Sequence, residues 1–559
     1  MKSDSAATKT LPAGRRRWVF LIATALLVPL LVVGTVEAFL RVADVGYRTE
    51  LLIPCTVQGS PASCYNLFFA APFFPAGMVQ TPRLYSIPTK KARGTFRIFV
   101  LGESAAMGDP DPAYGFSRYL EVMLRERFPS MKFEVVNTGS VAINSHVVLP
   151  IAKGLADQQP DLFIIYSGNN EAVGPYGPGT VLTSSGMSIP VVRGDILFRS
   201  SRIGQLVTKL GTQKQEWRGM EMFLDKQVRA DSPRMEPAYQ NFESNLREIA
   251  KIADHAGATV LLSTVATNLR DSAPFGSLHR RGLADDALHS WTAIVQQGDS
   301  LEKMGAFAEA LERYAAAAKI DDQFAELHFR MARCEWALGN YDAAHKSYVR
   351  ARDLDTLRFR ADSRINDVIR SVGASSGTQV KLLDAESLFA GESRNGIIGG
   401  ELLYDHVHLT PLGSYVLARA AFENIVPLLP VSVHSTGQNT GPLTQAECER
   451  LLAFTAHDRA RVASDMAGRL QRPPFTQQLN HLEEMQGLLF RASGTSESVQ
   501  DTVSEYQWAI QQDPSDLTLH YKFGFFLFDY DRNASAQELI LARPNDAFPV
   551  YLPDGTRIL

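Results

Sequence analysis

The chain has 559 residues, of which 45% are hydrophobic and 21% are charged, and this size and balance indicate packed globular protein in two or three domains. Its formal net charge is -4, and basic and acidic residues are mixed along most of the sequence. A nucleic-acid-binding protein would carry a clustered basic footprint, so the composition argues against a nucleic-acid partner.

A basic N-terminus followed by an apolar run predicts a membrane anchor. Three arginines at residues 15–17 precede an uncharged apolar stretch, residues 18–36, which is long enough to span a bilayer. A cleavable signal peptide would be shorter and would end at a small-residue site, so an uncleaved anchor at 18–40 is favoured over a signal peptide or a buried core helix. The arginines predict a cytoplasmic tail at 1–17, a single pass through the cell inner membrane, and a catalytic part in the periplasm or outside the cell.

The predicted juxtamembrane segment, residues 41–94, contains two of the four cysteines. Cys55 and Cys64 lie close together in a stretch with proline, glycine and serine, whereas Cys334 and Cys448 lie in helical contexts. In an exported chain we favour a disulfide between Cys55 and Cys64, with two unrelated free thiols as the alternative. The sequence has no C-x-x-C motif or Cys/His cluster with metal-ligand spacing, so no metal site is predicted.

Short β-branched or aromatic runs alternate with amphipathic stretches in two separate parts of the chain, which predicts a parallel α/β sheet. The predicted strands are residues 96–101, 133–137, 162–166, 259–265 and 380–383. We therefore expect one α/β domain in two parts, 95–290 and 359–431. Its first part includes an excursion at 173–237, which is too long for a simple crossover and which we expect to be a cap or substrate-binding segment.

A repeat of 34 residues separates the two parts, at 291–358. Gly305 pairs with Gly339 and Tyr314 with Tyr348, and six such positions keep register. This period and pattern resemble the tetratricopeptide repeat, a helix-turn-helix unit, so a protein partner is expected here. Two repeats bury little surface alone, so the pair should pack on the α/β domain or on the C-terminal region at 443–559, where a degenerate third copy begins near Tyr506.

Ser104 follows the first predicted strand in the sequence Leu101-Gly102-Glu103-Ser104. It therefore stands at the carboxyl edge of a parallel sheet, where open α/β folds place their ligand sites. A serine after a strand is more often a helix cap, so Ser104 alone is weak evidence for a nucleophile.

Two further segments end at the same edge of the sheet. Gly139 follows the second strand, and Asn170 follows the third within the sequence Gly-Asn-Asn-Glu. A serine esterase needs hydrogen-bond donors for the developing oxyanion, and the backbone amides of Ser104 and Gly139 with the Asn170 side chain would supply three.

The sequence Asp405-His406-Val407-His408 follows the fifth strand. An aspartate three residues before a histidine can hold one imidazole nitrogen and leave the other to take the serine proton. We therefore predict Ser104, Asp405 and His408 as catalytic residues. His406 is the competing base, but its adjacency to Asp405 points the two side chains apart.

These four elements in order resemble the SGNH (GDSL-like) hydrolase family over about residues 95–290 and 360–430. The resemblance implies a flavodoxin-like three-layer α/β/α sandwich of about five parallel strands, here with a helical tetratricopeptide insertion and a helical C-terminal region. It also implies ester or thioester hydrolysis through an acyl-serine intermediate. Glu103 and Glu171 stand where the commoner family pattern has aspartate, and both keep a carboxylate.

Three other features near the predicted site need an interpretation. Asn268 and Arg270 follow the fourth strand and either contact substrate or have a structural role in the turn. The second Gly-Glu-Ser triplet, residues 391–393, follows a helical stretch and not a strand, so we predict a loop there. The G-x-S-x-G nucleophile elbow is absent because Ala106 occupies the position of the second glycine.

The leading hypothesis is a membrane-anchored serine esterase acting on acyl or acetyl esters, with an acyl ester as substrate. An O-acyltransferase on an envelope polysaccharide would use the same acyl-serine, and a catalytically inactive tetratricopeptide scaffold is the third alternative. The proposed mechanism requires no cofactor.

Overall fold

The computed structural model describes residues 13–80, 84–211, 216–377, 379–430, 433, 441–492, 497–546 and 548–558. A five-stranded parallel sheet lies at its centre, in the order β5-β4-β6-β7-β8. The first strand in sequence lies between the second and the third, which is the flavodoxin-like doubly wound order. The strands are β4 (Thr95–Gly102), β5 (Lys132–Asn137), β6 (Leu162–Tyr166), β7 (Thr259–Ser263) and β8 (Val380–Leu383).

All five predicted strands are present. The central ones are mainly apolar because helices cover both faces, and the exception is the buried Arg97 of β4, which pairs with Glu134. Every residue of β4 and β6 is buried, as expected for a sheet without a solvent-facing side. The fourth strand ends two residues earlier than predicted, at Ser263. The chain then turns away, since the backbone N–H of Val265 donates to the Asn366 side chain instead of continuing the ladder.

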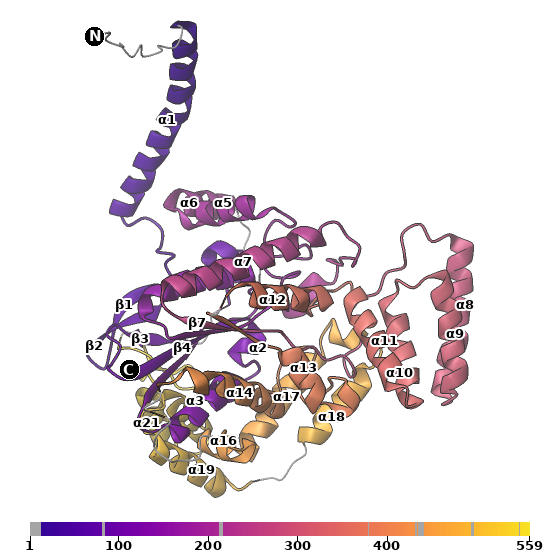
Figure 1. The fold of residues 1–559 in the computed structure, drawn as a ribbon. Helices are drawn as coiled ribbons and strands as arrows, with labels where there is room; N and C mark the ends of the chain where they lie inside the picture. Colours follow the sequence, from indigo (N-terminus) through magenta and orange to yellow (C-terminus); the bar gives the residue numbers. More distant parts are fainter. Residues whose placement is uncertain are drawn as a thin grey trace, which may run out of the picture.

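Two helical layers complete the sandwich (Figure 1). One layer contains α7 and α12, which pack against each other, with α4 against α7; the other contains α3 and α14, with α13 against α14. Their bounds are α3 (Phe116–Arg127), α4 (Ser145–Leu155), α7 (Met235–His255), α12 (Ser363–Ser375), α13 (Ala385–Glu392) and α14 (Pro411–Ile425). The predicted α/β/α sandwich is confirmed.

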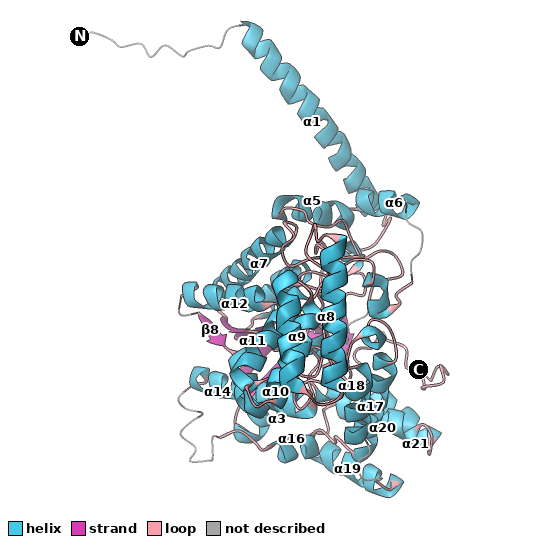
Figure 2. Cartoon of the chain, turned by 90° about the vertical axis from the view of Figure 1, so that its right-hand side faces the viewer, coloured by secondary structure: helices cyan, strands magenta, loops and turns pink. Residues whose placement is uncertain are grey.

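The repeat region forms two helical hairpins between β7 and β8, visible at the right of Figure 1 and the front of Figure 2. Buried Phe329 and Tyr348 of this region share an apolar cluster with Leu269 and Ile397 of the α/β domain. Arg333 also pairs with Glu483 of the C-terminal region. The insertion therefore packs on both neighbours. Its helices are α8 (Asp285–Lys303), α9 (Phe307–Ile320), α10 (Ala325–Ala337) and α11 (Tyr341–Leu354).

The C-terminal region is helical and docks against α3 and the loop before it. The Tyr114 and Phe454 rings lie 4.1 Å apart, and Arg125 pairs with Asp513 at 2.7 Å. Between this region and the α/β domain, residues 431–432 and 434–440 lie outside the described residues. The helices are α16 (Gln445–Leu451), α17 (Ala456–Leu470), α18 (His481–Ala492), α19 (Val499–Gln512), α20 (Leu517–Leu527) and α21 (Arg532–Leu541).

The N-terminal part begins with α1 (Ala13–Val42), which stands away from the body in both views (Figures 1 and 2). Its segment Phe20–Val42 has a mean hydropathy of 2.2 and is long and apolar enough to cross a membrane or to act as a signal sequence. Most of the predicted tail, residues 1–12, lies outside the described residues. A small antiparallel sheet follows, with β1 (Leu52–Val57), β2 (Ser60–Tyr65) and β3 (Ser86–Pro88).

The small sheet carries a disulfide between Cys55 of β1 and Cys64 of β2. Cys334 and Cys448 are buried free thiols. The long excursion after β6 contains two helices, α5 (Ile189–Ser200) and α6 (Arg202–Gly211). In Figures 1 and 2 these helices lie across the end of the body from which α1 departs.

Candidate active site

Ser104 is the first residue of the short helix α2 (Ser104–Met107), and only Glu103 lies between the end of β4 and this helix. The turn requires glycine at position 102, because a Cβ there would lie 2.0 Å from the backbone oxygen of Tyr166 on β6. This close approach places Ser104 at the carboxyl edge of the sheet, beside the point where the strand order reverses.

Ser104, His408 and Asp405 form a continuous hydrogen-bonded chain. The Ser104 Oγ lies 2.9 Å from His408 Nε2, and His408 Nδ1 lies 2.7 Å from Asp405 Oδ2. With Nδ1 donating to the carboxylate, Nε2 carries a lone pair that accepts the Ser104 hydroxyl. This arrangement has the geometry of a nucleophile, a general base and an orienting acid.

The Asp405 carboxylate is held by the same loop that carries the histidine. Its Oδ1 accepts the backbone N–H groups of Val407 and His408, each at 2.9 Å. Burial alone would raise the pKa of Asp405, but the charges of His408 and His406 and their side-chain hydrogen bonds outweigh it and place the pKa well below its usual value. Asp405 is therefore ionised and can stabilise an imidazolium at position 408.

His406 also lies beside this carboxylate, with its Nδ1 3.3 Å from Asp405 Oδ1, so the expectation that the Asp405 and His406 side chains point apart is wrong. The His406 ring packs edge to face on Phe275 with centroids 5.1 Å apart, and burial lowers its pKa. Asp405, His406 and His408 lie close enough to hold a metal ion. Because both Asp405 oxygens already accept protein donors, the cluster fits a hydrogen-bonded triad better than a metal centre.

The three expected oxyanion donors differ in their present partners. The Ser104 N–H belongs to the first turn of α2, where backbone donors have no intrahelical acceptor. The Asn170 side chain is partly exposed and donates one N–H to the Ile143 carbonyl at 3.0 Å, which leaves the second amide hydrogen. The Gly139 N–H, by contrast, donates to the Asn137 side chain at 2.9 Å. The single backbone hydrogen of Gly139 is thus already engaged within the protein, whereas Asn170 keeps a second amide hydrogen.

Glu103 connects the Ser104 turn to the loop that carries Asn170. Its carboxylate accepts the Ser167 hydroxyl and the Gly168 N–H at 3.0 Å, and the Asn169 N–H at 2.9 Å. Burial raises the pKa of Glu103 to about 7, against the lowering effect of these donors. Glu103 therefore links the Ser104 turn to the Asn170 loop through hydrogen bonds.

Glu171 holds the other end of the Asn170 loop. Both its oxygens accept from Ser145 at the start of α4, one from the backbone N–H and one from the hydroxyl, each at 2.8 Å. Burial raises the pKa of Glu171 to about 8, and the neighbouring charge of Glu103 adds to the rise. Asn170 is thus fixed between two buried carboxyl groups.

Asn268 and Arg270 both have partners within the protein. The buried Asn268 amide donates to the Asp405 carbonyl at 3.1 Å, and its backbone N–H donates to the His406 carbonyl. Arg270 pairs with Asp271 and Glu401. The geometry favours the structural alternative for both residues. Asn268 holds the loop that carries Asp405 and His406 by hydrogen bonds to their carbonyl groups.

One family model matches the chain. The tetratricopeptide repeat model covers residues 301–356, which confirms the repeat pair. A comparison with curated proteins finds no match.

Among solved structures, the chain is similar to a protein from Parabacteroides merdae ATCC 43184 described as GDSL-like lipase, at 10% identity and a TM-score of 0.29 over 60% of this chain and 98% of that one. A lipase/acylhydrolase from Enterococcus faecalis has 9% identity and a TM-score of 0.28, covering 60% and 97%. The acetyl xylan esterase AlAXEase has 10% identity and 0.28, covering 59% and 100%. These scores are too low to support an inference, so function is inferred from the side chains.

Two charged residues beside His408 were not anticipated from the sequence. Asp109 Oδ2 lies 3.0 Å from His408 Nε2, and Arg469 of α17 binds both Asp109 oxygens at 2.6 and 3.0 Å. Burial alone would raise the pKa of Asp109, but the charges of His408 and Arg469 outweigh it and lower the pKa. The C-terminal region therefore contributes a side chain to the surroundings of the triad.

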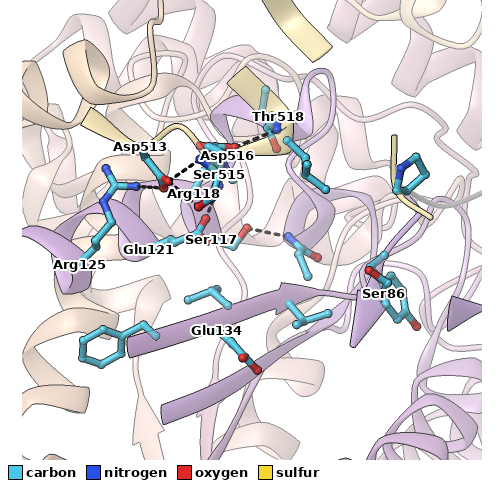
Figure 3. A pocket seen from close by; sticks show the side chains of 18 of the residues that line it. Ser86, Ser117, Arg118, Glu121, Arg125, Glu134, Asp513, Ser515, Asp516 and Thr518 are labelled. Carbon is cyan, nitrogen blue, oxygen red and sulfur yellow. Dashed lines mark hydrogen bonds and ion pairs between the residues drawn. The ribbon is translucent and has the colours of Figure 1, made fainter. Parts of the chain in front are cut away.

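A cavity of about 1190 Å³ lies between β5, α3 and the C-terminal helices (Figure 3). It reaches α2 at Met107, but the triad residues do not line it. Arg125 and Asp513 on its wall pair with each other, as do Arg118 and Asp516. The ion pairs on this wall thus connect the C-terminal region to the α/β domain. We assign the cavity no role in binding substrate.

Proposed function

We propose that this chain is a serine hydrolase that acts on ester bonds through an acyl intermediate on Ser104. The observation that carries the proposal is the hydrogen-bonded chain from Ser104 Oγ through His408 to Asp405, at 2.9 and 2.7 Å. Nothing in this chemistry requires a cofactor, since the nucleophile, base and orienting acid are all side chains.

In the proposed acylation step, His408 Nε2 takes the Ser104 hydroxyl proton as Oγ attacks the ester carbonyl carbon. The carbonyl electron pair moves to the oxygen. The resulting oxyanion accepts hydrogen bonds from the Ser104 amide and from the second amide hydrogen of Asn170. The Gly139 amide joins them if it exchanges Asn137 for the oxyanion. Collapse of this intermediate breaks the ester C–O bond, and His408 returns its proton to the departing alcohol.

In the deacylation step, a water molecule gives a proton to His408 and attacks the acyl carbon. The second tetrahedral intermediate releases the carboxylic acid and returns the proton to Ser104 Oγ. Asp405 stays ionised throughout and stabilises the imidazolium in both halves of the cycle.

We also propose that α1 anchors the enzyme in the inner membrane and places the catalytic part outside the cytoplasm. The apolar segment Phe20–Val42 and the arginines at 15–17 support this orientation. The Cys55–Cys64 disulfide is consistent with an oxidising compartment. The proposed organisation comprises an anchor at 18–40, a juxtamembrane segment at 41–94, the hydrolase domain at 95–290 and 359–431, the repeat pair at 291–358 and the C-terminal region at 443–559.

A second fate of the same acyl-enzyme is transfer to a hydroxyl group of an envelope polysaccharide. The observation that favours it is the position of Arg469, which brings a helical region outside the sandwich to within 3.3 Å of His408. The C-terminal region is thus adjacent to His408, the residue that must activate the acceptor hydroxyl. Product analysis with a sugar acceptor separates the two fates, because transfer yields an acylated sugar and hydrolysis yields the free acid.

The test of hydrolysis is turnover of p-nitrophenyl acetate and butyrate by the full-length protein purified in detergent. We expect serine-dependent turnover that is lost in Ser104→Ala and His408→Ala. Absence of turnover in the parent protein with either ester, and of any acylated product with a sugar acceptor, would favour the inactive-scaffold alternative.

A further inference from the structure

The consecutive helices α5 and α6 of the excursion, here called the α5–α6 segment, expose large apolar side chains. Leu197 and Phe198 of α5 are 74% and 44% exposed, and Val207 and Leu210 of α6 are 53% and 90% exposed. Water solvates such exposed apolar side chains poorly, and where they gather on consecutive helices they mark interaction sites.

The sequence of α6 is amphipathic, with its polar side turned inward. Leu206, Val207 and Leu210 recur at helical spacing on the exposed face, whereas Arg202 and Gln205 are buried against the rest of the chain. A helix that packs on a protein core has the opposite arrangement. The apolar face of α6 is therefore not used for packing within the described chain.

The buried side of α6 attaches it to the end of α1. The Glu37 carboxylate of α1 accepts the backbone N–H groups of Arg202 and Ile203, each at 3.1 Å, at the first turn of α6. Just beyond α1, the Gln205 side chain exchanges two hydrogen bonds with the Tyr47 backbone, at 2.9 and 3.0 Å. These contacts hold α6 at the level where the apolar segment of α1 ends.

The apolar surface continues on the neighbouring loop. Leu67 and Phe68 are 46% and 52% exposed, and the Phe68 ring stacks on Tyr47 with centroids 5.0 Å apart. In Figures 1 and 2, α5 and α6 lie across the end of the body that faces α1 and run crosswise to that helix. The end of the spanning segment and the apolar α5–α6 segment thus lie at the same end of the molecule.

We propose that α5 and α6 lie in the outer interface of the bilayer that α1 spans, as a second membrane contact of the catalytic part. The inference rests on the proposed anchoring by α1. Amphipathic helices parallel to a membrane bury their apolar face in the boundary between headgroups and acyl chains. With α1 and the α5–α6 segment both in contact with lipid, the body has one fixed orientation on the membrane. This part of the excursion is then a membrane-facing segment.

The test is the depth of single fluorophores in vesicles of phosphatidylcholine and phosphatidylglycerol that contain the full-length protein. An environment-sensitive dye is attached to Leu197→Cys or Leu210→Cys, while the natural free thiols, Cys334 and Cys448, are buried. Quenching is measured with lipids that carry a spin label near the headgroup or near the chain end. Val32→Cys in α1 serves as a positive control, and exposed Glu312→Cys on α9 serves as a negative control.

We expect the headgroup-proximal spin label to lower the fluorescence at positions 197 and 210 by about twofold or more, with weaker quenching from the chain-end label and none at position 312. Quenching at position 32 with none at 197 and 210 would overturn the proposed membrane contact of α5 and α6 and leave the anchor intact. Absence of quenching at all three positions would overturn both proposals, and neither result bears on the Ser104 chemistry.

Discussion

Ser104 Oγ and His408 Nε2 lie 2.9 Å apart although 304 positions separate the two residues in the chain. The separation is long because Ser104 follows the first strand of the sheet and His408 follows the last, and the repeat pair inserted between β7 and β8 lengthens it further. The proximity is thus a product of sheet topology, and the insertion leaves the triad intact because the repeats pack outside the sheet.

Asp405→Asn should reduce kcat by about 10⁴-fold. The amide can still accept the Val407 and His408 N–H groups through its oxygen, but its NH₂ group then faces His408 Nδ1. The imidazole must place its hydrogen on Nε2, where it can no longer accept the Ser104 proton. Steady-state hydrolysis of p-nitrophenyl acetate measures the loss, and a variant that keeps more than about a tenth of the parent rate would contradict the assigned tautomer.

Asp109→Asn should move the acidic limb of the kcat/KM profile to lower pH by about one unit. The groups that face the His408 ring are Asp405, Asp109, Arg469 and His406. Removal of the Asp109 charge disfavours the protonated imidazole, so the base becomes available at lower pH. The profile is measured with a neutral ester between about pH 5 and about pH 9.

The matched control is Arg469→Gln, which removes the opposite charge from the same group. Because Arg469 disfavours a protonated imidazole, its loss should move the acidic limb in the opposite direction, to higher pH. Shifts in the same direction, or no shift in either variant, would show that this pair has only a structural role.

Asn170→Ala should lower kcat by about 10²- to 10³-fold with little change in the melting temperature, because the side chain supplies an oxyanion donor. Asn169→Ala is the control, since Asn169 is buried and its oxygen accepts the Ala361 N–H at 3.1 Å. That variant should instead lose stability, by about 1–3 kcal/mol. Kinetics and thermal unfolding of both variants separate the roles, and an Asn170→Ala enzyme with full kcat would remove Asn170 from the mechanism.

Glu171 should make the protein less stable as pH rises. Its folded pKa is raised from 4.5 to about 8, so the folded state holds a proton that the unfolded state has released. The contribution is complete below about pH 4.5 and is lost as pH rises through about 8, a change on the order of 4 kcal/mol. Glu171→Gln should therefore flatten the fall in melting temperature between about pH 5 and about pH 8. Glu103 has the same sign and remains in the variant, so some slope persists; equal slopes in both proteins would refute the prediction.

The parts of the fold that depend on local pattern were predictable from the sequence. Short β-branched or aromatic runs identified the five strands, and a 34-residue period identified the repeats, because each signal is carried by the residues of the element itself. The spacing of Asp405 and His408 was equally informative, since a three-residue separation lets the carboxylate reach the ring within one turn.

Relationships between distant segments were not predictable in the same way. Asp109 and Arg469 meet only because α17 docks beside α2, and neither residue lies in a distinctive motif. Gly391 and Glu392, predicted as a loop, lie in the last turn of α13, where the Ser393 hydroxyl donates to the Phe389 carbonyl at 2.7 Å. The apolar pattern of α6 was readable, but which side faces the protein depends on its contacts with the end of α1.

The central claim is that Ser104 is the nucleophile, and the second Gly-Glu-Ser triplet provides a matched control because Ser393 is buried and caps α13. The most direct measurement is fluorophosphonate labelling of the full-length protein, its Ser104→Ala variant and its Ser393→Ala variant, with the modified residue located by peptide mass spectrometry. We predict a label on Ser104 in the parent and in Ser393→Ala, and none in Ser104→Ala. An unlabelled parent protein, or a label that persists in Ser104→Ala, would contradict the account.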